Sequence, residues 1–251
     1  MQIKPILTHK VTEADTDILS LIDRYVEKIE ENSLLVVTSK IIAICEGRLQ
    51  KINPATEIED KEKLVKEEAE YYIDKSENQY GFYLTITQNL LIPTAGIDES
   101  NGNGYYILWP KNPQNTANKI REHLATKHNV KNFGVIITDS KTTPLRWGTT
   151  GVSLAHSGFN ALNNYMGTPD LFGRELRVTK SHLADGLAAG AVAVMGEGKE
   201  STPLAMITEI SRIEFQERNP TDEELDGMHI SLETDVYAPI LKNAPWQKGK
   251  K

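Results

Sequence analysis

Three acidic residues, Asp98, Asp139 and Glu197, stand where an apolar stretch gives way to a polar or glycine-rich turn. Mg²⁺ and Mn²⁺ prefer carboxylate oxygens, joined by hydroxyl, water and phosphate oxygens. Carboxylates that project from separate elements can build such a site, and the hydroxyl of Ser140 could add a ligand. An acidic residue after a strand also serves as a turn former or a helix N-cap. The three carboxylates are therefore candidates for a divalent-cation site.

Two segments carry groups that can hold phosphate. Ser39 and Lys40 follow an apolar run, and their hydroxyl, backbone N–H and ammonium groups suit phosphate oxygens. The loop 196–201 is rich in glycine, which allows the backbone to approach a phosphate or a base closely. Neither segment has the Walker A spacing of Gly-x-x-x-x-Gly-Lys-Ser/Thr. These motifs favour phosphate binding without specifying a nucleotide.

Other reactive side chains have plainer interpretations beside the functional ones. Arg146 could clamp a carboxylate or phosphate through two parallel hydrogen bonds, or stack on Trp147 at the surface. His156 lies among small residues and is more typical of a structural histidine than of a general base. Cys45, the single cysteine, has no recognisable histidine partner motif, so a thiol nucleophile is not expected.

Short apolar elements must position these residues. The β-branched run 33–38 predicts a buried strand directly before Ser39, and 133–138 predicts a strand that leads into Asp139. An Ala-rich helix is predicted over 183–195 and stops at glycine. The remaining pattern predicts helices over 15–30, 57–74 and 116–127, strands over 83–92, 105–109 and 204–210, a loop over 95–104, mixed sheet and turns over 148–161, and a helix start at 220–224.

The elements do not alternate regularly, which favours an α+β fold with mixed sheets over a doubly wound one. We expect one domain over residues 1–251, or two small interleaved domains. A net charge of −7 argues against nonspecific nucleic-acid binding. The sequence has no membrane-spanning run and no signal-peptide core, so we expect a cytoplasmic protein that does not bind membranes.

Read in order, several motifs resemble the F420-0:γ-glutamyl ligase family. Each motif is modest alone, but six in the same order over about residues 34–207 are specific. The matching stretches are Val36-Val-Thr-Ser-Lys-Ile-Ile42 with Glu46-Gly-Arg48, Ala95-Gly-Ile-Asp-Glu-Ser-Asn101, Val135-Ile-Ile-Thr-Asp-Ser140 with Arg146 and Gly148, the stretch from Gly167 to Thr179 that contains Asp-Leu-Phe-Gly-Arg-Glu-Leu, Leu183-Ala-Asp185, and Met195-Gly-Glu-Gly198.

The resemblance implies an α+β fold that forms an intertwined homodimer, and GTP-dependent ligation with two divalent metals, Mg²⁺ or Mn²⁺. It implies that Asp98 and Asp139 hold one metal and that Ser140 and Glu197 hold the second. It also implies a set of nucleotide contacts and a catalytic role for Asp98, Asp139 and Arg146. The implied nucleotide contacts are Ser39, Lys40, Asn101, Met195, Gly196, Gly198 and Lys199, with the turn 9–12 nearby.

The reaction implied by the family is activation of a carboxylate. An acceptor carboxylate takes the terminal phosphoryl group of the nucleotide as an acyl phosphate, and the amino group of L-glutamate then displaces phosphate to form an amide. The metal carboxylates are intact here, but the surroundings depart from the family pattern. The departures are Ile44 in place of a frequent lysine, Asn112-Pro-Gln114 in place of Asp-Pro-Asp, Thr142-Thr143 in place of Gly-Arg, and Ser153-Leu-Ala-His156 in place of Ala-Ile-Gly.

These departures leave several alternatives open. The acceptor is F420-0 or a folate, with a lean toward an acceptor other than F420-0; the nucleotide is GTP or ATP, and the number of glutamates added is not specified. A noncatalytic nucleotide-binding homologue and a metal-dependent phosphohydrolase are the two rival functions. No role is predicted for residues 219–251.

Overall fold

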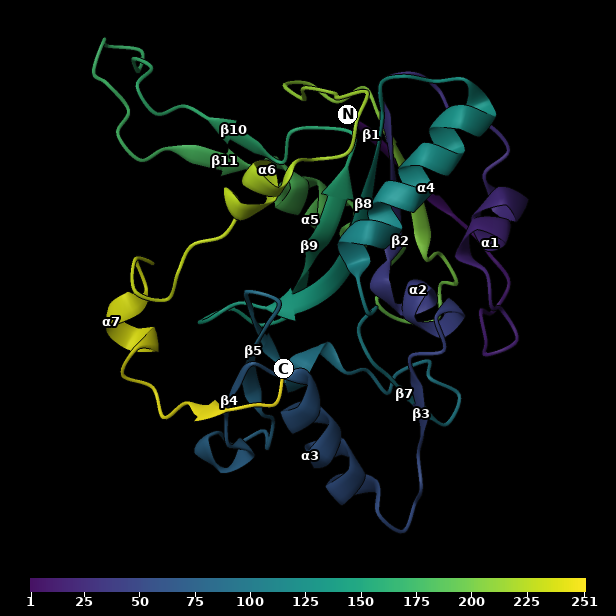
Figure 1. Ribbon diagram of the computed structural model, residues 1–251, viewed down its shortest axis with the longest axis vertical. Coiled ribbons are helices and arrows are strands. Elements are labelled where there is room, and N and C mark those ends of the chain that lie inside the picture. The colour runs from purple at the N-terminus through teal and green to yellow at the C-terminus, as the bar shows by residue number, and fades with distance from the viewer.

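The computed structural model describes all residues from 1 to 251 and is built around a five-stranded mixed sheet (Figure 1). The strand order is β1-β12-β2-β8-β9, and only the central pair, β2 and β8, is parallel. The strands are β1 (Gln2–Ile6), β12 (Leu204–Thr208), β2 (Ser33–Thr38), β8 (Phe133–Thr142) and β9 (Thr149–Ser157).

The apolar run in β2 explains its central place. Side chains alternate between the two faces of a strand, and here Leu35 and Val37 join one core cluster while Leu34 and Val36 join another. All four are fully buried. A continuous apolar strand is what a sheet covered on both faces requires.

Helices cover both faces of this sheet (Figure 1). One face packs against α1 (Ile18–Tyr25), α2 (Ser39–Cys45) and α4 (Pro113–His128). The other face packs against α5 (Leu183–Met195), whose Ala-rich surface allows a close approach. The helix α4 begins at the N-cap Asn112, whose side chain accepts the backbone N–H of Asn115, and ends at Asn129 in the left-handed conformation.

A smaller unit lies beside the main sheet. Its four-stranded sheet has the order β13-β4-β5-β6 and packs with α3 (Glu57–Glu68) around a separate core cluster. A two-stranded sheet of β3 and β7 lies next to it (Figure 1). The strands are β13 (Gln247–Lys248), β4 (Tyr71–Ile73), β5 (Leu84–Thr87), β6 (Leu90–Pro93), β3 (Leu49–Lys51) and β7 (Tyr105–Ile107).

The remaining elements are short. The strands β10 (Leu162–Asn164) and β11 (Lys180–His182) form the base of an arm that extends from the body (Figure 1). The C-terminal part contains α6 (Asp222–Asp226) and α7 (Ala238–Leu241) and returns to pair β13 with β4. Single 3₁₀ turns are η1 (Lys75–Glu77) and η2 (Thr94–Gly96). None of the helices is long and apolar enough to cross a membrane.

The α+β class and most elements agree with the sequence prediction, and the bounds of β2 and α5 are as predicted. Three predictions were wrong. The predicted helix 15–30 covers only Ile18–Tyr25, because the chain leaves the helix at the C-cap Val26. The predicted strand 83–92 is the hairpin β5–β6, because Gln88 and Asn89 adopt positive φ values of 50° and 59° and turn the chain. The predicted helix 57–74 ends at Glu68, because residues 71–73 pair with β5 instead.

Candidate active site

Asp98 is held by a strained turn. Residues 94–96 have φ values of 52°, 53° and 70°, a region that costs about 1–3 kcal/mol for a residue other than glycine. The backbone N–H of Ala95 donates to the hydroxyl of Thr85 at 3.0 Å, which helps to hold this conformation. Asp98 then exchanges two backbone hydrogen bonds with Ile107, at 3.0 and 2.8 Å. The backbone under this carboxylate is therefore fixed on both sides.

Lys40 faces Asp98 from the main sheet. It stands in the first turn of α2, directly after β2, and its Nζ lies 3.0 Å from Oδ2 of Asp98. The same ammonium donates to the backbone carbonyl of Ser100 at 3.1 Å. Because both side chains are partly exposed, such an ion pair contributes only about 0–1 kcal/mol to folding. Its effect is to place a positive charge beside the carboxylate.

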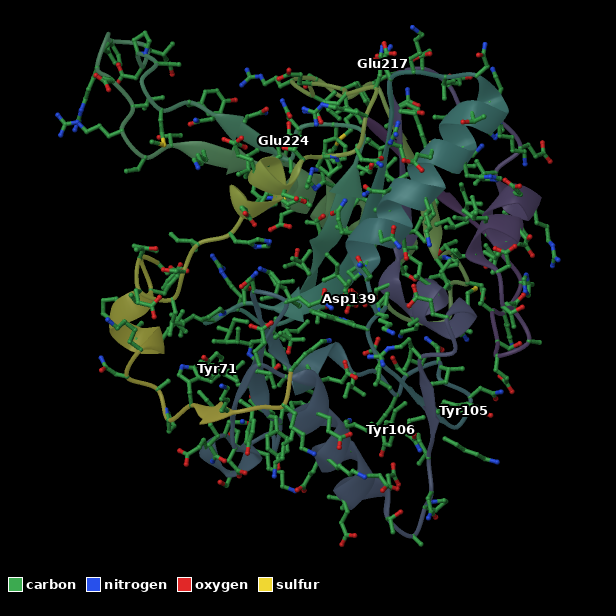
Figure 2. The ribbon with its side chains drawn as sticks, in the orientation of Figure 1. Tyr71, Tyr105, Tyr106, Asp139, Glu217 and Glu224 are labelled. Carbon is green, nitrogen blue, oxygen red and sulfur yellow. The ribbon has the colours of Figure 1, made fainter.

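Asp139 projects from β8 just after a register shift between Ile137 and Thr138 (Figure 2). The backbone N–H of Ser140 donates to its Oδ1 at 2.8 Å, and the indole N–H of Trp109 donates to its Oδ2. Burial, together with the charge of Asp98, raises the pKa of Asp139 to about 7. The two carboxylates therefore lie close enough for their negative charges to repel.

Trp109 reaches Asp139 because Gly96 leaves room for it. A Cβ atom at Gly96 would lie 2.2 Å from the indole ring, well inside van der Waals contact, and the φ of 70° also favours glycine. The indole is almost fully buried, so its N–H needs a partner. Sequence reasoning missed Trp109, because no pattern in the chain indicates which group a buried indole meets.

Glu197 comes to Ser140 from the other face of the sheet. Ser140 pairs with Gly151 of β9, and a Cβ at Gly151 would lie 2.4 Å from the carbonyl oxygen of Ala188 in α5. Glycine therefore lets α5 lie against β9, and the end of this helix delivers Glu197 to the site. Its Oε1 accepts the hydroxyl of Ser140 at 2.6 Å and that of Thr149 at 3.2 Å. Thr149 is a second residue that the sequence did not point to.

A cavity of about 740 Å³ joins these groups. The amide of Asn101 donates to the carbonyl of Gly198 at 3.0 Å and links two of the loops around it. Segments 8–12 and 196–203 form another part of the wall, connected by the bond from Thr8 N–H to Ser201 O at 2.9 Å. The predicted site residues that line the cavity are Lys40, Asp98, Asn101, Asp139, Ser140, Met195, Gly196, Glu197, Gly198 and Lys199.

Two predicted site residues lie elsewhere. Ser39 is buried under the start of α2 and does not line the cavity. Arg146 lies on the exposed loop between β8 and β9, and its guanidinium has no hydrogen bond or ion pair within the chain. Its neighbour Trp147 contacts Tyr80 rather than Arg146. Ile44 lines the cavity at a position where the family resemblance implies a lysine. The cavity therefore has one positive charge fewer than the family pattern implies.

The donor set fits hard cations that also bind phosphate. No group of three or more His, Cys, Asp or Glu side chains is arranged to hold a metal ion. The oxygen donors occur instead as two pairs, Asp98 with Asp139 and Ser140 with Glu197. Mg²⁺ is commonly bound by one or two carboxylates together with waters and substrate phosphates. The raised pKa of Asp139 also indicates a place where added positive charge is favourable.

His156 and Cys45, the other two reactive residues considered in the sequence, do not line this cavity. His156 is buried in β9 and lies outside the cavity lining, and burial lowers its pKa to about 4. His156 packs edge-on against Phe159 in the interior, but its Nδ1 has no hydrogen-bond partner, so the expected hydrogen-bonded structural role is not observed. Burial raises the pKa of the Cys45 thiol to about 12, which keeps it protonated near neutral pH.

Comparison with known proteins identifies relatives with one kind of activity. Residues 6–209 match the family model described as F420-0:Gamma-glutamyl ligase. The coenzyme F420:L-glutamate ligase of Methanococcus maripaludis (strain C6) is 36% identical over 198 residues, covering 74% of this chain and 79% of the relative. The enzyme of the same name from Archaeoglobus fulgidus is 31% identical over 239 residues, covering 90% of this chain and 92% of the relative.

Proposed function

The chain belongs to the F420-0:gamma-glutamyl ligase family, and from this premise we propose that it joins L-glutamate to an acceptor carboxylate by consuming a nucleoside triphosphate. The observation that carries the proposal is the convergence of Lys40, Asp98, Asp139 and Glu197 on one cavity. These residues come from four segments that are far apart in the sequence, and the fold brings them together at one cavity.

The polar groups of the cavity divide into two tasks. Lys40 and Lys199 supply positive charge for phosphate oxygens, and Asn101 supplies an amide that can turn from Gly198 to a ligand. The two oxygen pairs would hold divalent cations, with Asp98 and Asp139 at one and Ser140 and Glu197 at the other. Bound Mg²⁺ or Mn²⁺ would supply neutralisation of the charge on the β- and γ-phosphates.

The reaction then needs no protein nucleophile. An oxygen of the acceptor carboxylate attacks the γ-phosphorus, the bond to the nucleoside diphosphate breaks, and an acyl phosphate forms. The amine nitrogen of L-glutamate attacks the acyl carbon, phosphate leaves, and the nitrogen loses a proton as the amide forms. The chain contributes by positioning both substrates and by holding charges where they develop.

The acceptor class follows from the relatives in part. Their names give coenzyme F420 and L-glutamate as substrates, and we include F420-0 among the acceptors of this chain. A folate is the second acceptor class, because its glutamate tail also grows by amide formation and the sequence departs from the family near Arg146, at Thr142 and Thr143. The nucleotide is GTP or ATP. An intertwined homodimer is part of this proposal, and the mass of the protein in solution tests it.

The experiment supplies L-glutamate, Mg²⁺ or Mn²⁺ and GTP or ATP to the purified chain, with F420-0 and a folate monoglutamate offered separately. We expect a product one glutamyl residue heavier than one of the acceptors, detected by mass spectrometry. Turnover of F420-0 alone would exclude the folate acceptor. Nucleotide binding with no product from any acceptor would favour a noncatalytic homologue. Hydrolysis that needs neither glutamate nor acceptor would favour a phosphohydrolase.

A further inference from the structure

Two aromatic rings from different parts of the fold meet at the surface. Trp147 lies on the loop between β8 and β9, and Tyr80 lies on the loop before β5. Their ring centroids are 6.1 Å apart with an interplanar angle of 84°, an edge-to-face contact. Trp147 is nevertheless 90% exposed, and Tyr80 is 55% exposed. Most of the indole surface is therefore open to a ligand.

Neither ring lines the active-site cavity, but the loop that carries Trp147 begins and ends next to residues that do. Thr142 and Thr149, the two residues at the foot of the loop, both line the cavity, and Thr149 touches Glu197. Trp147 is two residues from Thr149, so their Cα atoms are at most about 7 Å apart. The span from the indole to the carboxylates of the site is on the order of 10–15 Å once the side chains are included.

The exposed rings have a physical cost that a flat ligand would remove. A buried tryptophan contributes more apolar area than almost any other side chain, and here that area faces water. Arg146, next to Trp147, adds a cation whose guanidinium has no partner in the chain. An aromatic face beside an unpaired cation suits a flat heteroaromatic molecule that carries negative charge.

We propose that Trp147 and Tyr80 form the subsite for the flat heteroaromatic ring of the acceptor. The ring stacks on Trp147, and the acceptor's terminal carboxylate extends past Thr149 to the site of Asp139 and Glu197. This inference rests on the proposed ligase function. It fits the substrate class, because both acceptor candidates are extended molecules with a ring at one end and a carboxylate at the other.

The experiment measures binding and turnover separately. Deazaflavin and pterin rings are fluorescent, so anisotropy of the acceptor itself reports binding without turnover. Trp147→Ala is expected to weaken acceptor binding and to raise the acceptor KM about tenfold, in the range for loss of one stacking contact. Trp147→Phe, which keeps a ring, is expected to stay within about threefold of the parent protein. The KM for nucleotide should not change.

Leu145→Ala is the matched control, because Leu145 is fully exposed on the same loop and makes no ring contact. Unchanged acceptor binding by Trp147→Ala would overturn the subsite. A rise in the nucleotide KM would also overturn the subsite, because it would assign the rings to the nucleotide base. A change in the mass of the protein in solution would overturn it as well, because it would assign the rings to contact with a second copy of the chain. Ring binding that depends on Trp147 without ligation of glutamate would refute the proposed function and retain the subsite.

Discussion

The floor and the rim of the cavity are built in different ways. The floor is the group Asp139, Trp109 and Ser140, where both carboxylate oxygens of Asp139 accept N–H groups and residues 133–138 of the strand that leads to it are buried. What we call the rim is the loop 143–148, which does not line the cavity itself but joins Thr142 and Thr149, which do. Its residues are mostly exposed, and Arg146 has no hydrogen-bond or ion-pair partner. Groups that must be fixed to within a fraction of an ångström stand on the sheet, whereas the loop can change without disturbing them.

The most severe test of the floor is Asp139→Asn. It removes the negative charge while preserving the shape, and we expect glutamate-dependent phosphate release to fall at least about a thousandfold. Folding should be retained, because the neutral amide relieves repulsion with Asp98. The matched control is Asp226→Asn, at an exposed position on α6. Unchanged release by Asp139→Asn would show that the floor has been assigned to the wrong residues.

Trp109→Phe separates positioning from charge at the floor. Phenylalanine keeps an aromatic ring behind Asp139 but removes the N–H that holds Oδ2. Loss of such a supporting contact typically weakens metal affinity by about 10–100-fold, so we expect a Mn²⁺ dissociation constant raised by that factor. Trp246→Phe is the control, because the indole of Trp246 donates to the backbone carbonyl of Leu241 and does not line the cavity. Equal Mn²⁺ affinity for both variants would reduce Trp109 to a packing residue.

The buried His156 in β9 makes the stability of the main sheet, which carries the floor, depend on pH. Its pKa is about 4 in the folded chain and about 6.5 when unfolded, so the unfolded chain binds the proton more readily. Folding is therefore most stable above pH 6.5 and loses stability as the pH falls toward 4, by up to roughly 3 kcal/mol. His156→Gln should flatten this acid limb in thermal unfolding curves measured from pH 7 to 4. An unchanged acid limb would mean that other groups cause it.

Removing the positive charge of Arg146 from the rim should change activity and stability less than the substitutions at the floor do. Arg146→Ala is expected to leave thermal stability unchanged and to alter phosphate release with saturating substrates less than about threefold, because the side chain is exposed and makes no hydrogen bond or ion pair. A hundredfold loss would erase the distinction between floor and rim. It would also restore the catalytic role that the family resemblance implies for Arg146. Steady-state kinetics with the parent protein measured in parallel decides this point.

The positions where strands end could be predicted from the sequence, but the side chains from other elements that contact these ends could not. The apolar runs predict strands that end just before Lys40 and Asp139, but the parallel pairing of β2 with β8, which brings these ends together, is seen only in the structure. The contact of Trp109 with Asp139 depends on the absence of a Cβ at Gly96, which no periodicity reveals. The family resemblance is confirmed by the family match. The single-domain organisation and the cytoplasmic location stay predictions.

The most direct test of the account is the dependence of phosphate release on both co-substrates. Release from GTP and from ATP is measured with Mg²⁺ or Mn²⁺, with L-glutamate and an acceptor supplied singly and together. A ligase built on this cavity should release phosphate rapidly only when both are present, in equal amount to the glutamyl product. Equally rapid release with both omitted would contradict the account and identify the cavity as that of a phosphohydrolase.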